Sequence, residues 1–232
     1  MPGRASIRIR KIAPMNFKQG ERDAFIERFD AGADIVKRLD IYADLLLKWQ
    51  KSINLVGPTT LTSVWMRHFW DSAQLVPLAM GRKTWLDLGS GAGFPGLVAA
   101  IFLSEQAGAS VQLIESDQRK CAFLREVSRE TGIGAKIHNC RIEAATISQN
   151  PPIEIVSARA LTSMKNLFGY TQEYIDSGAI GLFPKGQDVA SELTQAAIPS
   201  NISVELASSE TDVSGRIVIL RRKISGLSEA AG

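Results

Sequence analysis

Hydrophobic positions in the first eighty residues recur with the spacing of helices. From Glu21 to Trp49, apolar side chains repeat at three- and four-residue intervals, which places them on one helical face. Gly32 interrupts this stretch and is expected to separate two helices. Residues 61–78 show further helical spacing that should close near Pro77. The pattern therefore predicts an all-helical region over residues 21–80.

After residue 83 the apolar pattern changes to short runs that alternate with helical segments. Strands that alternate with helices predict a parallel sheet covered on both faces. The last two apolar runs are close together in the chain and predict an antiparallel pair that closes the sheet. The expected strands are 85–88, 111–115, 136–139, 153–157, 179–183, 202–206 and 215–221, and the expected helices are 96–104, 118–131, 164–175 and one that begins at Asp188.

Composition is that of an ordinary globular protein. Of the 232 residues, 45% are hydrophobic and 22% are charged, which excludes disorder, collagen and coiled coil as overall descriptions. The longest apolar runs, such as 97–103, are far shorter than the roughly 18 residues that span a bilayer, so no membrane partner is expected. Cys121 and Cys140 are too few for a disulfide framework or a metal site of their own. A reducing, cytoplasmic setting and no bound metal are therefore expected.

The net charge of +3 is unevenly distributed along the chain. Residues 1–20 hold five basic side chains and no acidic one, whereas the remainder holds 22 basic and 24 acidic side chains. The basic segment lacks both the Ser-rich amphipathic pattern of a transit peptide and the apolar core of a signal peptide. We expect a solvated, disordered tail over residues 1–20, with a nucleic-acid-binding arm as the alternative.

The strongest motif is the glycine-rich segment 86–96, which reads LDLGSGAGFPG and joins the first predicted strand to the next helix. Glycines at such a turn let the backbone approach a ligand closely. Two ligand classes fit this segment, nicotinamide dinucleotides and S-adenosylmethionine. Residues 91–96 match the dinucleotide pattern G-x-G-x-x-G. Glu115 follows at the end of the next strand, where its carboxylate would bind the ribose diol that both ligands carry. The carboxylate of Asp87 favours S-adenosylmethionine, since a pyrophosphate disfavours a nearby acid. An NAD(P)-dependent oxidoreductase remains the alternative.

The candidate catalytic side chains are cations. The two histidines and two cysteines have no obvious partner in the sequence that would make them a base or a nucleophile. In contrast, Arg141, Arg159 and Lys185 follow the third, fourth and fifth predicted strands. Ligands bind beyond the carboxyl ends of such strands, and cations there suit phosphates or the carbonyl edge of a base. An acceptor with a free lone pair would need alignment and desolvation more than proton transfer.

At these residues the sequence resembles a known family, the bacterial small-subunit rRNA guanine-N7 methyltransferase G, also called glucose-inhibited division protein B. The resemblance covers roughly residues 45–187. Its specific elements are R-H-x-x-D-S at 67–72, S-A-R-A at 157–160 and the Lys185-Gly186 pair, whereas the glycine loop alone indicates only a methyltransferase. The other matching elements are Trp49 with 54–55, 87–96, 115–120 with 123–124, and 141–143.

The resemblance implies an α/β fold, with a Rossmann-like class I S-adenosylmethionine-dependent methyltransferase sheet over residues 81–224 that is mostly parallel and closed by an antiparallel pair. It implies that the enzyme uses S-adenosylmethionine to methylate N7 of a guanine, position 527, in the 530 loop of 16S rRNA. The partner would be 16S rRNA or the small ribosomal subunit, and the enzyme is expected to act as a monomer. A non-catalytic RNA-binding protein that retains a nucleotide pocket is a further alternative.

The resemblance also assigns site residues. Together with the glycine-loop analysis, the expected cofactor-binding residues are Asp87, Gly89, Gly91, Gly93, Phe94, Glu115, Ile142, Glu143 and Arg159. The expected catalytic or RNA-contacting residues are Asn54, His68, Arg141, Arg159 and Lys185. Two positions depart from the family: Ser90 stands where threonine is common, and Glu115 where aspartate is common.

Overall fold

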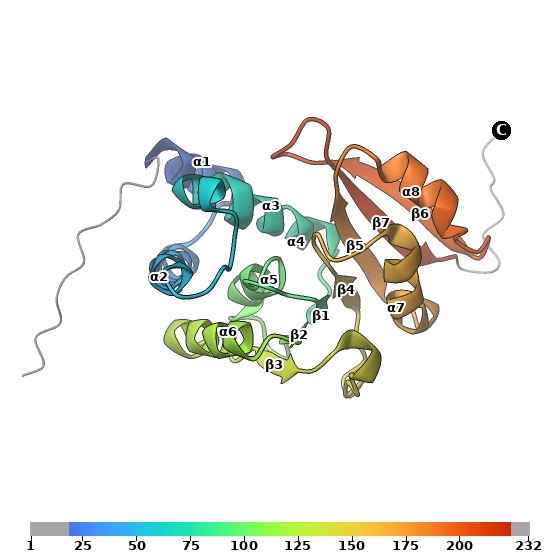
Figure 1. The fold of residues 1–232 in the computed structure, drawn as a ribbon, viewed down its shortest axis with the longest axis horizontal. Coiled ribbons are helices and arrows are strands. Elements are labelled where there is room, and N and C mark those ends of the chain that lie inside the picture. Colours follow the sequence, from blue (N-terminus) through green and yellow to red (C-terminus); the bar gives the residue numbers. More distant parts are fainter. Residues whose placement is uncertain (1–18, 224–232) are drawn as a thin grey trace, which may run out of the picture.

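A seven-stranded sheet with helices on both faces forms the centre of the structure, a computed structural model that describes residues 19–223 (Figure 1). The strand order is β3-β2-β1-β4-β5-β7-β6. The first five strands are parallel, β7 runs antiparallel to β5, and β6 runs antiparallel to β7. This confirms the predicted sheet and its closing pair. The strands are β1 Thr84–Leu88, β2 Ser110–Glu115, β3 Lys136–Asn139, β4 Ile155–Ser157, β5 Ile180–Lys185, β6 Ile202–Ser208 and β7 Arg216–Arg222.

Helices cover the two faces of the sheet in separate groups. The helices α5 and α6, together with the N-terminal helices α1 and α2, lie on one side, and α7 and α8 lie on the other (Figure 1). Side chains along a strand alternate between the two cores, so that Trp85 of β1 joins the first and Leu86 joins the second. The helix bounds are α1 Gln19–Phe29, α2 Ala33–Gln50, α5 Gly96–Leu103, α6 Gln118–Thr131, α7 Met164–Asp176 and α8 Val189–Ala196.

The N-terminal region is helical as predicted, but its second half is broken into short pieces. Gly32 is the N-cap of α2 and separates it from α1. In place of one helix over residues 61–78, the chain forms a 3₁₀ helix, a π turn and two short α-helical turns. Apolar spacing predicts helical structure but not such breaks, because all these helix types share similar local periodicities. The four pieces are η1 Pro58–Ser63, η2 Trp65–Trp70, α3 Asp71–Ala73 and α4 Leu75–Leu78.

One continuous apolar core joins the helical region to the sheet. It contains Leu39 and Leu46 of α2, Trp65 of η2, and Leu97 of α5, all fully buried. The division between residues 21–80 and 81–224 therefore describes the chain order, and both parts share this core. Residues 1–18 of the expected basic tail lie outside the described residues.

The described residues contain neither a membrane-spanning helix nor a metal-binding cluster. No helix among residues 19–223 has the length and apolar character needed to cross a membrane. The same part of the chain holds no group of three or more His, Cys, Asp or Glu side chains arranged to bind a metal ion.

The close approach of α5 to β1 leads to a stability prediction. A Cβ added at Gly96, the first residue of α5, would lie 2.8 Å from Cβ of the buried Asp87. We expect Gly96→Ala to lower the free energy of unfolding by about 1–3 kcal/mol, because neither backbone can easily move. Urea denaturation would measure this change.

Gly169 supplies the matched control, since it lies in α7 with open space around its added Cβ. Gly169→Ala should raise the free energy of unfolding by about 0.5–1 kcal/mol through helix propensity. Equal effects of the two substitutions would contradict the close packing of α5 on β1.

Candidate functional site

The glycine loop between β1 and α5 forms the floor of the site. Gly91 has a φ of +56°, a left-handed conformation that suits glycine. Gly93 also has a positive φ, and a Cβ there would lie 2.7 Å from the Tyr42 hydroxyl. The Tyr42 hydroxyl donates a hydrogen bond to the backbone oxygen of Ala92. The glycines therefore serve two purposes: Gly91 permits the turn, and Gly93 permits α2 to pack against the loop.

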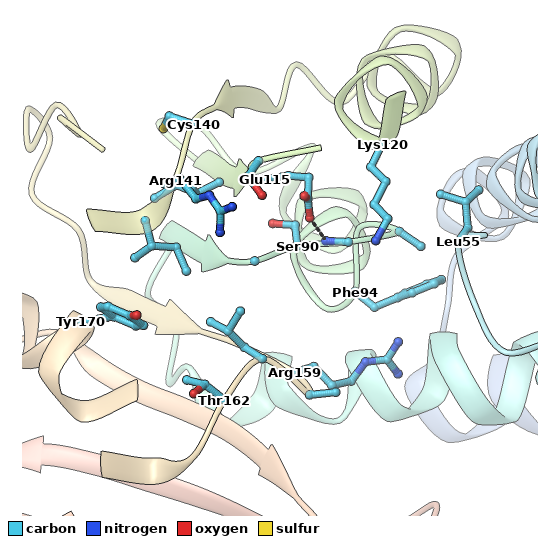
Figure 2. A pocket seen from close by; sticks show the side chains of 18 of the residues that line it. Leu55, Ser90, Phe94, Glu115, Lys120, Cys140, Arg141, Arg159, Thr162 and Tyr170 are labelled. Carbon is cyan, nitrogen blue, oxygen red and sulfur yellow. Dashed lines mark hydrogen bonds between the residues drawn. The ribbon is translucent and has the colours of Figure 1, made fainter. Parts of the chain in front are cut away.

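The carboxylate of Glu115 ties this loop to the end of β2. One of its oxygens accepts a hydrogen bond from the Gly91 amide at 2.9 Å, and the other accepts one from the Asp117 amide at 2.7 Å. The side chain is almost buried but borders the cavity above the loop (Figure 2). Each carboxylate oxygen has more than one lone pair, so both can accept a further hydrogen bond from a ligand.

The first cavity has a volume of about 580 Å³, a size that suits a small-molecule cofactor. It opens between the glycine loop, the end of β2, and the segments after β3 and β4 (Figure 2). Its lining includes Gly89, Ser90, Gly91, Ala92, Phe94, Glu115, Lys120, Arg141, Ile142, Glu143, Arg159, Thr162 and Tyr170.

The segment after β3 is held in place across this cavity by α7. The Tyr170 hydroxyl donates a hydrogen bond to Oε1 of Glu143 at 2.7 Å. That hydrogen bond lowers the pKa of the Glu143 carboxyl and raises the pKa of Tyr170. Ile142 begins the short helix η3 Ile142–Ala144, which brings its backbone to the cavity wall.

A second cavity, of about 690 Å³, adjoins the first. Both are lined by Leu55 and Val56 and by residues 159–162. Arg159 therefore stands in a wall that the two cavities share. The second cavity is also lined by Thr60, Arg67, His68, Asp71, Lys185, Gly186, Glu192, Ser209, Thr211, Asp212 and Arg216.

Arg159 is fixed from several sides. Its guanidinium carbon lies 4.9 Å from the centroid of the Phe94 ring. One terminal nitrogen donates to Oδ2 of Asp71 at 3.0 Å, and the other donates to Nδ1 of His68 at 3.1 Å. Only about a fifth of the side chain is exposed, which strengthens these charged contacts relative to surface pairs.

His68 is a neutral hydrogen-bond acceptor in this arrangement. Burial, together with the positive charges of Arg159 and Arg67, lowers the pKa of His68 to about 3. Because Nδ1 accepts from Arg159, we assign the proton to Nε2, which donates to Oγ1 of Thr60 at 2.8 Å. The lone pair of the ring is thus already used, so His68 does not suit the role of a general base.

Three aromatic rings form a stack beneath Arg159. The Phe94 ring lies between Tyr42, with centroids 5.2 Å apart, and His68, with centroids 4.8 Å apart. Both pairs are nearly parallel, at 19° and 16°. The stack joins α2 and η2 to the glycine loop.

Lys185 has a paired charge instead of a free one. Its Nζ donates to Oε2 of Glu192 at 2.8 Å and to the backbone oxygen of Thr162 at 2.7 Å. Burial raises the pKa of Glu192, but hydrogen bonds from Lys185 and the Met164 amide outweigh it and the net shift is downward. One N–H of the ammonium group remains for a ligand in the second cavity.

Asp87 lies behind the loop and not in either cavity. Its side chain is fully buried, and Oδ1 accepts a hydrogen bond from Oγ of Ser157 at 2.6 Å. Oδ2 has no hydrogen-bond partner among the described residues and faces Gly96. Burial raises the pKa of the Asp87 carboxyl to about 6, although the hydrogen bond from Ser157 opposes the shift. Asp87 therefore lines neither cavity, and its expected contact with a cofactor stays a prediction.

The structure brings most of the expected residues together. Seven of the nine expected cofactor residues line the first cavity, and Asp87 and Gly93 do not. Of the expected cations, Arg141 lines the first cavity, Lys185 the second, and Arg159 both. Asn54 is exposed beside the cavities without lining either.

Several site residues escaped sequence analysis. Tyr170, Thr60 and Thr211 reach the site from segments that carry no motif of their own. Asp71 belongs to the R-H-x-x-D-S element, which signalled its importance but not its partner.

Comparison with known proteins gives a consistent result. The family model described as "GidB: rRNA small subunit methyltransferase G" matches residues 35–214. The protein named ribosomal RNA small subunit methyltransferase G of Methylorubrum populi is 44% identical over 197 residues, 85% of this chain and 93% of the relative. The protein of the same name from Caulobacter vibrioides is 43% identical over 187 residues, 81% of this chain and 85% of the relative.

Solved structures support the fold. A putative O-methyltransferase from Klebsiella pneumoniae has a TM-score of 0.58 at 12% identity and covers 88% of this chain and 97% of that chain. A mutant of MtNAS in complex with S-adenosylmethionine has a TM-score of 0.52 at 13% identity and covers 87% of this chain and 84% of that chain. The predicted class I methyltransferase fold is thereby confirmed.

The buried carboxyl of Asp87 predicts an unusual pH dependence. The folded state keeps this proton up to about pH 6, whereas the unfolded chain releases it near 3.8, so the folded state binds more protons between these values. The contribution of Asp87 to stability is thus fully present below pH 3.8 and falls as the pH rises to about 6. We expect the unfolding free energy of the wild type, relative to Asp87→Asn, to decrease by about 2–3 kcal/mol between pH 4 and pH 7.

Urea denaturation of both proteins across this range would measure the difference. Asp212 is the control, because hydrogen bonds from Ser214 lower its pKa, so that it is ionised in both the folded and the unfolded state over most of this range. The stability of the wild type relative to Asp212→Asn should therefore change little between pH 4 and pH 7. A wild-type advantage over Asp87→Asn that does not vary with pH would contradict the role assigned to burial.

Proposed function

The chain belongs to the rRNA small subunit methyltransferase G family, and from this membership we propose that it methylates N7 of a guanine in the 530 loop of 16S rRNA. Methylation of small-subunit rRNA is the activity that the description of this family names. The choice of atom and of loop is our proposal. Family membership removes the oxidoreductase alternative.

The first cavity fits S-adenosylmethionine in size and in the chemistry of its lining. The backbone of Gly89 and Gly91 leaves room for the methionine part, and the nearly buried Glu115 would accept hydrogen bonds from the ribose diol. Ile142 and Glu143 would border the adenine ring, steadied by Tyr170. The chemistry that the cofactor supplies is an electrophilic methyl group on a positively charged sulfur.

The observation that carries the proposal is the shared wall at Arg159. A methyl donor in the first cavity and an acceptor base in the second would meet beside this guanidinium. Arg159 and Lys185 can each donate to the O6 oxygen of guanine, the neighbour of N7. Alignment and exclusion of water then do the catalytic work.

The acceptor atom is argued from the proton chemistry of the site. His68 has a pKa of about 3 and its ring nitrogens are both engaged. Both carboxylate oxygens of Asp71 are engaged as well. Guanine N7 carries a free lone pair and loses no proton when methylated, so its methylation requires no general base from this site. The monomeric state and the cytoplasmic setting stay predictions.

The central experiment is a transfer assay on ribosomal material. Small subunits and naked 16S rRNA from cells that lack this protein would be incubated with the purified protein and methyl-labelled S-adenosylmethionine. We expect the label in N7-methylguanosine after nuclease digestion, and within the 530 loop after fragment mapping. Label in another nucleoside or another region would contradict the proposal. Binding of rRNA without transfer would favour the non-catalytic alternative.

The role of Glu115 predicts a change in cofactor affinity. Glu115→Gln keeps the shape of the side chain but removes the charge that strengthens hydrogen bonds to hydroxyls. We expect S-adenosylhomocysteine to bind roughly tenfold more weakly to Glu115→Gln, and about 1.5–3 kcal/mol more weakly to Glu115→Ala, by calorimetry. Glu126→Gln is the control, because the Glu126 carboxylate accepts a hydrogen bond from Nε1 of Trp49 and lines neither cavity. Wild-type affinity in both Glu115 variants would exclude this role.

A further inference from the structure

We infer that Asp71 is a positioning residue for methyl transfer, which holds Arg159 in the wall between the two cavities. The inference rests on the proposed function, because it takes that wall as the place where donor and acceptor meet. The contacts of the Asp71 carboxylate carry the argument.

The carboxylate of Asp71 receives donors from its own helical stretch and from two distant segments of the chain. Oδ2 accepts from NH1 of Arg159 at 3.0 Å, after β4. Oδ1 accepts from Oγ1 of Thr211 at 2.8 Å, in the β6–β7 loop, and from Nε2 of Gln74 at 3.0 Å. About a fifth of the side chain is exposed. These hydrogen bonds fix the orientation of the Asp71 carboxylate, which in turn fixes the position of the Arg159 guanidinium.

The effect of Asp71 on Arg159 can be seen from the N–H groups of the Arg159 guanidinium. A guanidinium has five N–H groups in a rigid plane. Within residues 19–223, NH1 donates to Asp71 and to the backbone oxygen of Arg67, and NH2 donates to His68. The second N–H of NH2 and the Nε–H are left for groups outside the protein. Asp71 thus sets the plane in which these two N–H groups meet a ligand.

The hydrogen bond from Thr211 connects Asp71 to the β6–β7 loop, which also lines the second cavity. Thr211 belongs to residues 209–215, and Glu210 of the same loop accepts from Nε1 of Trp70 at 2.9 Å. The backbone amide of Glu210 donates a hydrogen bond to Oε1 of Gln74 at 2.8 Å. Asp71, Gln74 and Trp70 lie in one short helical stretch, so the β6–β7 loop and Arg159 are held by the same element. Asp71 therefore relates the position of Arg159 to a second part of the lining of this cavity.

A purely structural ion pair is the competing interpretation. Exposed ion pairs often contribute little to stability, and the loss of a pair that only supports the fold would leave kcat unchanged in the folded protein. A positioning role predicts a different result. The effect of an Asp71 substitution on kcat should then disappear when Arg159 has been replaced. A double-mutant cycle separates the two cases.

The experiment compares Asp71→Asn, Arg159→Ala and the double variant in the rRNA methylation assay, with melting temperature and S-adenosylhomocysteine affinity measured for each. We expect Asp71→Asn to lower kcat roughly 10- to 100-fold, because a misplaced catalytic group costs about this much. Cofactor affinity should change by less than about threefold. In the Arg159→Ala background, Asp71→Asn should lower kcat by less than about twofold.

Thr211→Val is the second variant, and it keeps the inference testable if Asp71→Asn does not fold. It removes the donor to Oδ1 and should lower kcat about two- to fivefold, again only when Arg159 is present. Asp40→Asn is the matched control. Asp40 accepts two hydrogen bonds from Arg22, with donor–acceptor distances of 3.1 and 2.8 Å, and this pair lines neither of the two cavities. The kcat of Asp40→Asn should equal that of the wild type even if its melting temperature falls.

The outcomes distinguish the two proposals. A wild-type kcat in folded Asp71→Asn, or an equal loss with and without Arg159, would overturn the positioning role and leave the proposed function intact. A wild-type protein that transfers no methyl group to rRNA would overturn the proposed function and the inference with it.

Discussion

The site is assembled around the ring of Phe94. This ring lies between Tyr42 of α2 and His68 of η2, and the guanidinium of Arg159 lies against it. Three segments that are far apart in the chain therefore meet on one side chain of the glycine loop. The approach requires that Gly93 has no Cβ, because the Tyr42 hydroxyl occupies that space. A loop that could bind a ligand by itself is thus also the surface on which the N-terminal helices pack.

The second organising feature is the compensation of buried charge. Arg159 is balanced by Asp71 and Lys185 by Glu192, so neither cation is a free phosphate-binding group. Charges that are mostly buried and paired keep fixed positions, and the remaining N–H groups of the two cations point in defined directions. His68 contributes as a neutral acceptor with a pKa of about 3. The site is therefore built to orient an acceptor and exclude water, which agrees with an acceptor atom that carries its own lone pair.

Much of the fold could be predicted because local spacing carries it. The boundaries of α6 and β3 agree with the predicted 118–131 and 136–139, since amphipathic periodicity and capping residues are local signals. The helical stretch at 61–78 was predicted in type but not in its breaks, which arise where Trp65 and Phe69 pack into the core. The position of Asp87 near the end of a strand predicts a contact with the cofactor, which stays a prediction; the direction of its side chain depends on Ser157 of a different strand.

The sequence alone determined the order of strands and helices, the glycine loop, and the three cations at strand ends. These features depend on residues that are neighbours in the chain or that follow a fixed period. Only the tertiary structure decided which cation stands between the cavities, which ones are paired, and that Asp71 joins Arg159 to Thr211 across 88 and 140 residues of sequence. Such contacts depend on how helices pack against the sheet. That packing is set by the shapes of many buried side chains together, so no local pattern encodes it.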